Sequence, residues 1–96
     1  MASDLLTQLQ AWYADQCDGD WEHTYGITIE SLDNPGWRVQ VDLVGTRLAR
    51  LIDEGVQVEH SATDWLHWSV SDGRFVAACG PSGLGGAISA FLALTR

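Results

Sequence analysis

The sequence contains no lysine, and its basic side chains are arginines that first occur at Arg38. Residues 1–37 therefore carry acidic side chains without a compensating Lys or Arg, and the formal net charge of the chain is −8. Such a chain repels the phosphates of nucleic acids and anionic membranes, so neither is expected as a partner. An acidic surface steers association toward basic partners, although solubility alone would also explain the charge.

Cysteine is scarce as well, and long apolar runs are missing. The two cysteines, Cys17 and Cys79, lie far apart in the sequence, and the N-terminal stretch MASDLLTQLQAWY lacks the basic region of a secretory signal. Free thiols in a reducing compartment are therefore expected instead of a disulfide, which predicts a cytoplasmic location. No stretch approaches the roughly 18 consecutive apolar residues of a transmembrane helix.

The length of 96 residues predicts one domain, residues 1–96, with a single core. Ser3 or Asp4 is expected to cap a first helix by accepting a hydrogen bond from a free N–H group of its first turn. Gly19 is expected to end that helix in a left-handed conformation. The apolar face of the helix is predicted to contain Leu5, Leu6, Leu9, Trp12 and Tyr13.

Residues 25–32 and 37–44 alternate between apolar and polar side chains, which predicts two strands. Because successive side chains of a strand point to opposite faces, the loop between the strands must bring apolar residues onto one face. An odd-numbered loop centred on Pro35 meets this requirement, with Gly36 supplying a positive φ. The pairs expected from this loop are Ile29 with Val41, Ile27 with Leu43, and Glu30 with Gln40.

The segment between these strands and the next hairpin allows two interpretations. Leu48, Leu51 and Ile52 have helical spacing, with Gly55 as a possible cap, but an irregular segment fits the stretch 45–55 equally well. Residues 56–60 alternate again, which predicts a short strand.

Asp72-Gly73 lies between two alternating runs, residues 65–71 and 74–79, and this dipeptide is typical of a type I′ hairpin turn. The turn predicts three core pairs: Val70 with Phe75, Trp68 with Ala77, and Leu66 with Cys79. The other face of this hairpin is expected to be half exposed and to carry Trp65, His67, Ser69, Val76 and Ala78.

A last helix is expected after Gly80-Pro81, and the glycines at 83, 85 and 86 favour a late start. Its buried face is predicted to contain Leu84, Ile88, Phe91 and Leu92. Together these elements predict an α+β fold: an antiparallel sheet of four or five strands with an N-terminal and a C-terminal helix packed on one face. The opposite face of the sheet is then open or meets a partner.

The acidic stretch after the first helix does not fit a metal site. A calcium loop that starts at Asp18 would need Gly in the place of His23 and Glu in the place of Ile29. Cys17 and His23, with the distant His60 or His67, lack the paired spacing of protein metal ligands. No metal or other cofactor is therefore expected.

The thiol of Cys79 precedes the last helix, and a helix N-terminus can lower the pKa of a thiol toward that of a nucleophile. The predicted hairpin instead places Cys79 opposite Leu66 in the core, where thiols are usually inert. The glycines of residues 80–86 lack the Lys-Ser/Thr of a phosphate-binding loop. We therefore predict that the protein is not an enzyme, and keep as the alternative a small thiol- or metal-dependent enzyme that uses Cys79 or Cys17 with a His.

Five tryptophans are many for this length. Trp12, Trp37 and Trp68 fall on faces predicted to be buried, whereas Trp21 and Trp65 fit those faces less well. An exposed Trp beside acidic residues is typical of a binding hot spot. For Trp21, this interpretation and that of a lid over the end of the sheet both stay open.

One long pattern carries a family resemblance. The stretch 17–37 reads CDGDWEHTYGITIESLDNPGW, followed by VDLVGT at 41–46, DWLHW at 64–68, DGRF at 72–75 and Gly80-Pro81 before the last helix. These segments, over roughly Leu5 to Leu94, resemble the Imm53 family of bacterial immunity proteins. The resemblance implies an antidote that binds and silences a toxin domain encoded beside it in a polymorphic toxin system.

The resemblance also implies a partner and a surface. The partner would be the cognate toxin domain, a protein with basic contact residues, and the chain itself would be a monomer or a weak dimer. The densest matches to the family pattern, together with Trp65, are the candidate partner-binding residues: Asp18, Asp20, Trp21, Glu22, His23, Asp33, Asn34, Trp37 and Trp65.

Overall fold

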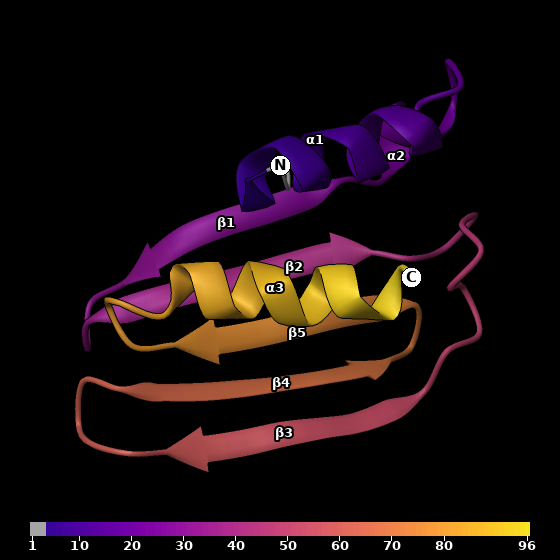
Figure 1. Cartoon of the computed structure of the whole chain (residues 1–96). Coiled ribbons are helices and arrows are strands. Elements are labelled where there is room, and N and C mark those ends of the chain that lie inside the picture. Colours follow the sequence, from indigo (N-terminus) through magenta and orange to yellow (C-terminus); the bar gives the residue numbers. More distant parts are fainter. Residues whose placement is uncertain (1–3) are drawn as a thin grey trace.

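The structure, a computed structural model, describes residues 4–96 and combines one antiparallel sheet with helices. The strand order is β1–β2–β5–β4–β3 (Figure 1). The elements are α1 (Leu5–Gln16), α2 (Trp21–Thr24), β1 (Ile27–Leu32), β2 (Gly36–Asp42), β3 (Asp53–Glu59), β4 (Trp65–Ser71), β5 (Arg74–Cys79) and α3 (Leu84–Leu94). The predicted α+β fold is confirmed with five strands, whereas the short helix α2 was not predicted.

Asp4 caps α1, because its Oδ1 accepts a hydrogen bond from the backbone N–H of Thr7 at 2.7 Å. Ser3, the other predicted cap, lies outside the described residues. The helix ends at Gln16 with Cys17 as its C-cap. Gly19 has the predicted positive φ, 91°, but it lies in the loop beyond this cap.

The apolar face of α1 is narrower than predicted. Leu9 is buried, and Leu5 and Trp12 pack against the core. Leu6 and Tyr13 are 59% and 38% exposed, so their assignment to the buried face is wrong. The reason is position: α1 packs against α3 at the edge of the fold, beside the edge strand β1, so only one stripe of the helix is covered (Figure 1).

The turn between β1 and β2 is centred on Asn34 and not, as predicted, on Pro35. The three predicted pairs are therefore wrong, and the observed pairs are Ile27 with Val41, Ile29 with Val39, and Glu30 with Arg38. Both the predicted and the observed turn contain an odd number of residues. The side chains consequently lie on the predicted faces, although the register is shifted.

Gly36 explains the shift, because it belongs to the ladder of β2 and pairs with Leu32. The positive φ predicted for it is wrong. A Cβ atom at this position would instead collide with the backbone carbonyl oxygen of Cys79 on β5. Glycine is therefore required here for the close approach of two strands, not for a turn.

The hairpin of β4 and β5 matches its prediction. Asp72 and Gly73 both have positive φ, 53° and 74°, as a type I′ turn requires. The three core pairs are those predicted: Val70 with Phe75, Trp68 with Ala77, and Leu66 with Cys79.

Residues 43–52 form turns, so the helical interpretation of this stretch is wrong. Leu48 is nevertheless buried, and turns closed by the carbonyl groups of Thr46 and Leu48 fold the segment over the end of the sheet. Gly55 does not cap a helix but lies inside β3 with a φ of 74°, where the pairing with β4 shifts register. The third strand therefore starts at Asp53, earlier than predicted.

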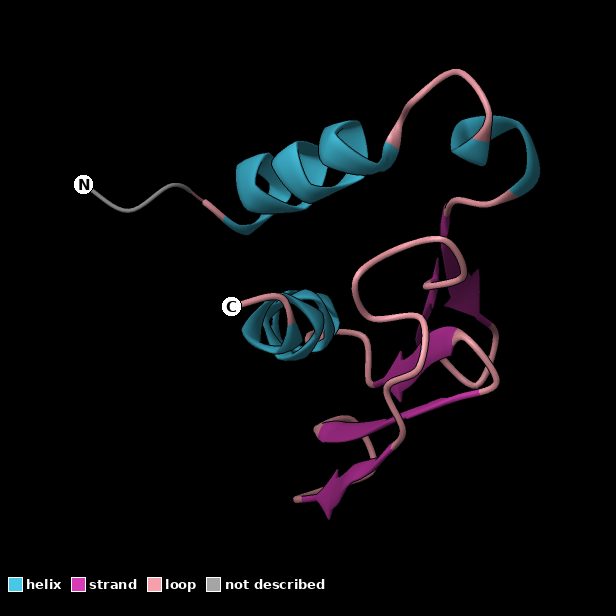
Figure 2. Ribbon diagram, turned by 90° about the vertical axis from the view of Figure 1, so that its right-hand side faces the viewer, coloured by secondary structure: helices cyan, strands magenta, loops and turns pink. Residues whose placement is uncertain are grey.

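The core lies between the sheet and the two long helices, which are on the same side of it (Figure 2). α3 starts at Leu84 after Gly83, as expected, and packs across β2, β5 and β4. The buried core contains Leu9, Val39, Val41, Leu43, Leu48, Val70, Phe75, Ala77, Cys79, Ala87, Ile88, Phe91 and Leu92. The other face of the sheet carries no helix among the described residues, and we call it the open face. No described helix is long and apolar enough to cross a membrane.

The close approach at Gly36 generates a prediction on stability. We expect Gly36→Ala to lower the free energy of unfolding by about 1–3 kcal/mol, because the added methyl group must push β2 away from the Cys79 carbonyl. Gly26→Ala is the control, since a Cβ there meets no atom within 4 Å. It should change stability by less than about 0.5 kcal/mol. Urea unfolding of both variants measures the difference, and equal stabilities would contradict the prediction.

Candidate functional site

The nine candidate residues lie in two groups at opposite ends of β1 (Figure 1). The first group belongs to residues 17–24, which we call the acidic loop; it contains Asp18, Asp20, Trp21, Glu22 and His23. The second group lies near the β1–β2 turn, which we call the hairpin end; it contains Asp33, Asn34, Trp37 and Trp65. The structure therefore does not bring the candidate residues into one site.

The side chains of Asp18 and Glu22 hold the acidic loop in its conformation by accepting backbone hydrogen bonds. The Oδ1 atom of Asp18 accepts hydrogen bonds from the backbone N–H groups of Asp20 and Trp21, at 3.0 and 2.9 Å. The carboxylate of Glu22 reaches back and accepts from the N–H groups of Asp18 and Gly19, at 3.0 and 2.9 Å. This reciprocal bonding resembles a capping box and starts the short helix α2.

The same hydrogen bonds favour the charged forms of both side chains. Bonds from the backbone N–H of Trp21 and then of Asp20 hold the pKa of Asp18 below its ordinary value of 3.8. The pKa of Glu22 is lowered from 4.5, first by its own backbone N–H and further by those of Asp18 and Gly19. The loop thus holds two stable negative charges at the surface.

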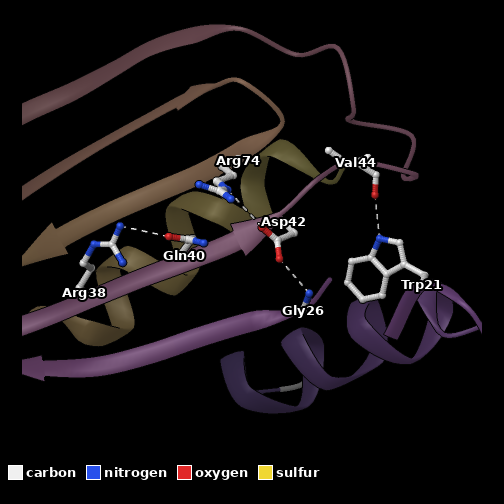
Figure 3. A network of polar contacts seen from close by, with 7 residues as sticks. All are labelled: Trp21, Gly26, Arg38, Gln40, Asp42, Val44 and Arg74. Atoms are coloured by element: carbon white, nitrogen blue, oxygen red, sulfur yellow. Dashed lines mark hydrogen bonds and ion pairs between the residues drawn. The ribbon is translucent and has the colours of Figure 1, made fainter. Parts of the chain in front are cut away.

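Trp21 is the lid and not an exposed hot spot. Only 6% of the residue is exposed, and its Nε1–H donates a hydrogen bond to the carbonyl oxygen of Val44 at 2.8 Å (Figure 3). Its ring meets Trp12 and Tyr13 edge to face, at centroid distances of 6.1 and 6.0 Å. Trp21 therefore fixes the acidic loop against the fold, while Asp20 and His23 remain exposed.

On the open face beside the acidic loop, charged side chains are bonded to other groups of the protein. Asp42 accepts a hydrogen bond from the backbone N–H of Gly26 at 3.0 Å and lies 3.5 Å from the guanidinium of Arg74 (Figure 3). Arg38 bonds the Gln40 side chain at 3.1 Å and pairs with Glu30. These contacts tie β1, β2 and β5 together.

At the hairpin end the two tryptophans lie on opposite faces of the sheet. Trp37 is opposite Cys79 on the face that the helices cover, and its Nε1–H donates to the Pro81 carbonyl at 3.0 Å. Trp65 lies on the open face, in register with Glu59. Asn34 is exposed in the turn, as is its neighbour Asp33. Trp37 thus positions the start of α3, whereas Asp33 and Asn34 face solvent and Trp65 is half-buried.

A hollow of about 480 Å³ lies on the open face at the hairpin end. We call it the Trp65 hollow; its lining includes Asn34, Glu59, Ser61, Trp65, His67 and Ala78. Glu59 and His67 were not among the predicted partner-binding residues. Their side chains form a contact of 3.0 Å between His67 Nε2 and Glu59 Oε1. The sequence placed His67 on the half-exposed face, but no signal predicted which residues of β3 it would meet.

Both thiols are free, and they differ in burial: Cys17 is partly exposed, whereas Cys79 is buried. Cys79 is fully buried, and this burial raises the pKa of its thiol, which opposes a nucleophilic role. The Cys17 thiol donates to the Tyr13 carbonyl at 3.3 Å. Within residues 4–96, no group of three or more His, Cys, Asp and Glu side chains is arranged to hold a metal ion.

The lowered pKa values predict how stability depends on pH. Because the folded pKa values of Asp18 and Glu22 lie below the ordinary ones, their contribution is present above the unfolded pKa values and is lost as the pH falls through the folded values. Below about pH 4 the wild type should therefore lose stability more steeply than Asp18→Asn with Glu22→Gln, whose amide oxygens still accept hydrogen bonds but do not titrate. Urea unfolding at a series of pH values tests this, and parallel curves would contradict it.

Comparison with known proteins adds one match. The sequence matches the family described as Immunity protein 53, Imm53, over residues 6–96, which include both the acidic loop and the hairpin end. No curated protein and no solved structure matches the chain. Since the family match covers nearly the whole sequence, the chain belongs to the Imm53 family of immunity proteins.

Proposed function

We propose that the protein binds and neutralises a cognate toxin domain and catalyses no reaction itself. The observation that carries the proposal is the family match over residues 6–96. The net charge of −8 supports a toxin with a basic contact surface, since opposite charges accelerate and orient association. The protein would act in the cytoplasm, where its free thiols are stable, as a monomer or weak dimer.

The acidic loop is suited to steering the toxin toward the protein. Asp18 and Glu22 already accept backbone hydrogen bonds, so what they offer a partner is mainly charge. Charge acts over about 10 Å at ordinary ionic strength and needs no direct contact. Asp20 and His23 are exposed beside them. Trp21 contributes by holding the loop in place, because its own ring is buried.

The hairpin end is suited to direct contact. Asp33 and Asn34 are exposed in the β1–β2 turn, and Trp65 lies across the sheet from them in the lining of the Trp65 hollow. Aromatic side chains in hollows with polar rims are frequent hot spots of protein interfaces. Trp37 contributes from the covered face, where it holds the start of α3 through Pro81.

Colony survival tests the proposed function directly. Bacteria that express the toxin domain encoded beside this gene should die without this protein and form colonies with it. Cys17→Ser should protect as well as the wild type, because the proposed inhibition uses no thiol.

A toxin variant without catalytic activity serves as the control for general effects of expression. Failure of soluble, folded protein to rescue the cells would overturn the proposal. Rescue that is lost with Cys17→Ser would favour the thiol enzyme instead.

Electrostatic steering by exposed acidic residues predicts an effect on the rate of association with the toxin. Asp20→Asn together with Asp33→Asn removes two exposed charges and leaves the hydrogen bonds of Asp18 and Glu22 in place. Association with the toxin should become severalfold slower at low salt, with little change in the dissociation rate. Stopped-flow measurements give both rates.

High salt supplies the internal control for this experiment. Because salt screens exposed charges, the association rates of the variant and the wild type should converge as ionic strength rises. Equal rates at low salt would contradict steering by these two residues.

A further inference from the structure

Two glycines lie against the indole of Trp65, which lines the hollow. Gly36 on β2 and Gly80 after β5 lie beside Trp65, and the backbone N–H of Gly80 donates to the Trp65 carbonyl at 3.0 Å. A Cβ on Gly36 would lie 3.5 Å from the indole atom Cζ2, and one on Gly80 3.3 Å from Cδ1. The indole thus rests across bare backbone on two neighbouring segments. This support holds the ring as a half-buried platform on the open face.

A carboxylate stands beside the platform. Glu59 is opposite Trp65 in the β3–β4 ladder, and its side chain is 69% exposed. The contact with His67 uses Oε1 of Glu59, which leaves Oε2 for a further donor. The centroids of the Trp65 and His67 rings are 5.2 Å apart. Because His67 also contacts Glu59, the carboxylate lies beside the indole. Asn34, with an amide oxygen, lines the same hollow from the β1–β2 turn.

No Lys or Arg lines the Trp65 hollow among the described residues. Arg38 is in register with Ala78 of the lining, but its guanidinium is held by Gln40 and Glu30, as Figure 3 shows for Gln40. The hydroxyl of Ser61 is also occupied, since it accepts from the backbone N–H groups of Thr63 and Asp64. The hollow therefore offers an aromatic face, a carboxylate and an amide, and no described Lys or Arg side chain lines it.

We propose that the Trp65 hollow binds an arginine side chain of the toxin. This inference rests on the proposed function and names the chemistry of one contact within it. A guanidinium is planar and can stack on an indole, and it can donate to a carboxylate at the same time. Trp65 would supply the stacking face, and Glu59 would accept the N–H donors. The acidic charge of the whole chain favours such a cationic side chain over an acidic one.

Matched variants on the neighbouring strands β3 and β4 test the proposal. Glu59→Gln removes the charge but keeps an oxygen for His67, and Trp65→Leu removes the aromatic face but still covers the glycines. Each should raise the Kd for the toxin domain at least about tenfold. Glu54→Gln is the control, because it removes an exposed charge from β3 outside the hollow. Trp65→Phe keeps an aromatic face and should retain most of the affinity.

Titration calorimetry with the purified toxin domain measures these constants, and thermal unfolding confirms that each variant is folded. The double variant Glu59→Gln with Trp65→Leu should lose less affinity than the product of the single losses, because both side chains contact one guanidinium. Sedimentation of the protein alone reports whether a second copy fills the hollow.

The possible results distinguish the proposal on the Trp65 hollow from the proposed immunity function. If the wild type binds the toxin and Glu59→Gln and Trp65→Leu bind it equally well, the hollow proposal is overturned while the immunity function stands. If the two substitutions change self-association and leave toxin binding intact, the occupant is a second copy and the proposal is likewise overturned. If the wild type does not bind the toxin, the proposed function fails, and the hollow proposal fails with it.

Discussion

A continuous series of aromatic contacts connects the sheet with all of its helices, and the rest of the structure depends on it. Trp68 of β4 stacks on Phe75 of β5 at 5.7 Å, and Phe75 meets Phe91 of α3 at 5.3 Å. Phe91 then meets Trp12 of α1 at 4.9 Å, which in turn meets Trp21 of α2. Aliphatic side chains such as Leu9, Val41 and Ile88 form the rest of the core. The acidic loop is therefore held by the same side chains that hold the fold.

Comparison of the two hairpins shows what local sequence can predict. Asp72-Gly73 determined its own turn, because both residues accept positive φ and the strands on either side alternate cleanly. The β1–β2 turn was displaced because Gly36 is required by a strand that arrives much later in the sequence, at Cys79. The face of each side chain was still predictable, since it depends only on whether the turn is odd or even. Close approaches between distant segments leave no local signal.

The arrangement of the candidate site was likewise not predictable from the local sequence. The acidic residues of 17–24 were recognisable, but their division into loop-forming Asp18 and Glu22 and exposed Asp20 depends on backbone geometry. Residues that are dense in the sequence pattern proved to lie at opposite ends of β1. Glu59 could not be assigned to the hollow, because residues 60–64 contain no dipeptide such as Asp-Gly that would predict its pairing with Trp65. The family resemblance supplied the class of function, whereas the arrangement of the surface required the fold.

The two glycines beneath Trp65 limit how the recognition surface can diverge in related proteins. A side chain at Gly36 or Gly80 is unfavourable, because each Cβ would collide with a backbone carbonyl. Among the residues that line the hollow, Asn34, Ser61 and Ala62 belong to the turns after β1 and β3. Turns tolerate substitution better than a paired sheet does. An immunity protein built in this way can follow changes in its toxin through turn residues around the hollow, while the two glycines that support the indole are inherited unchanged.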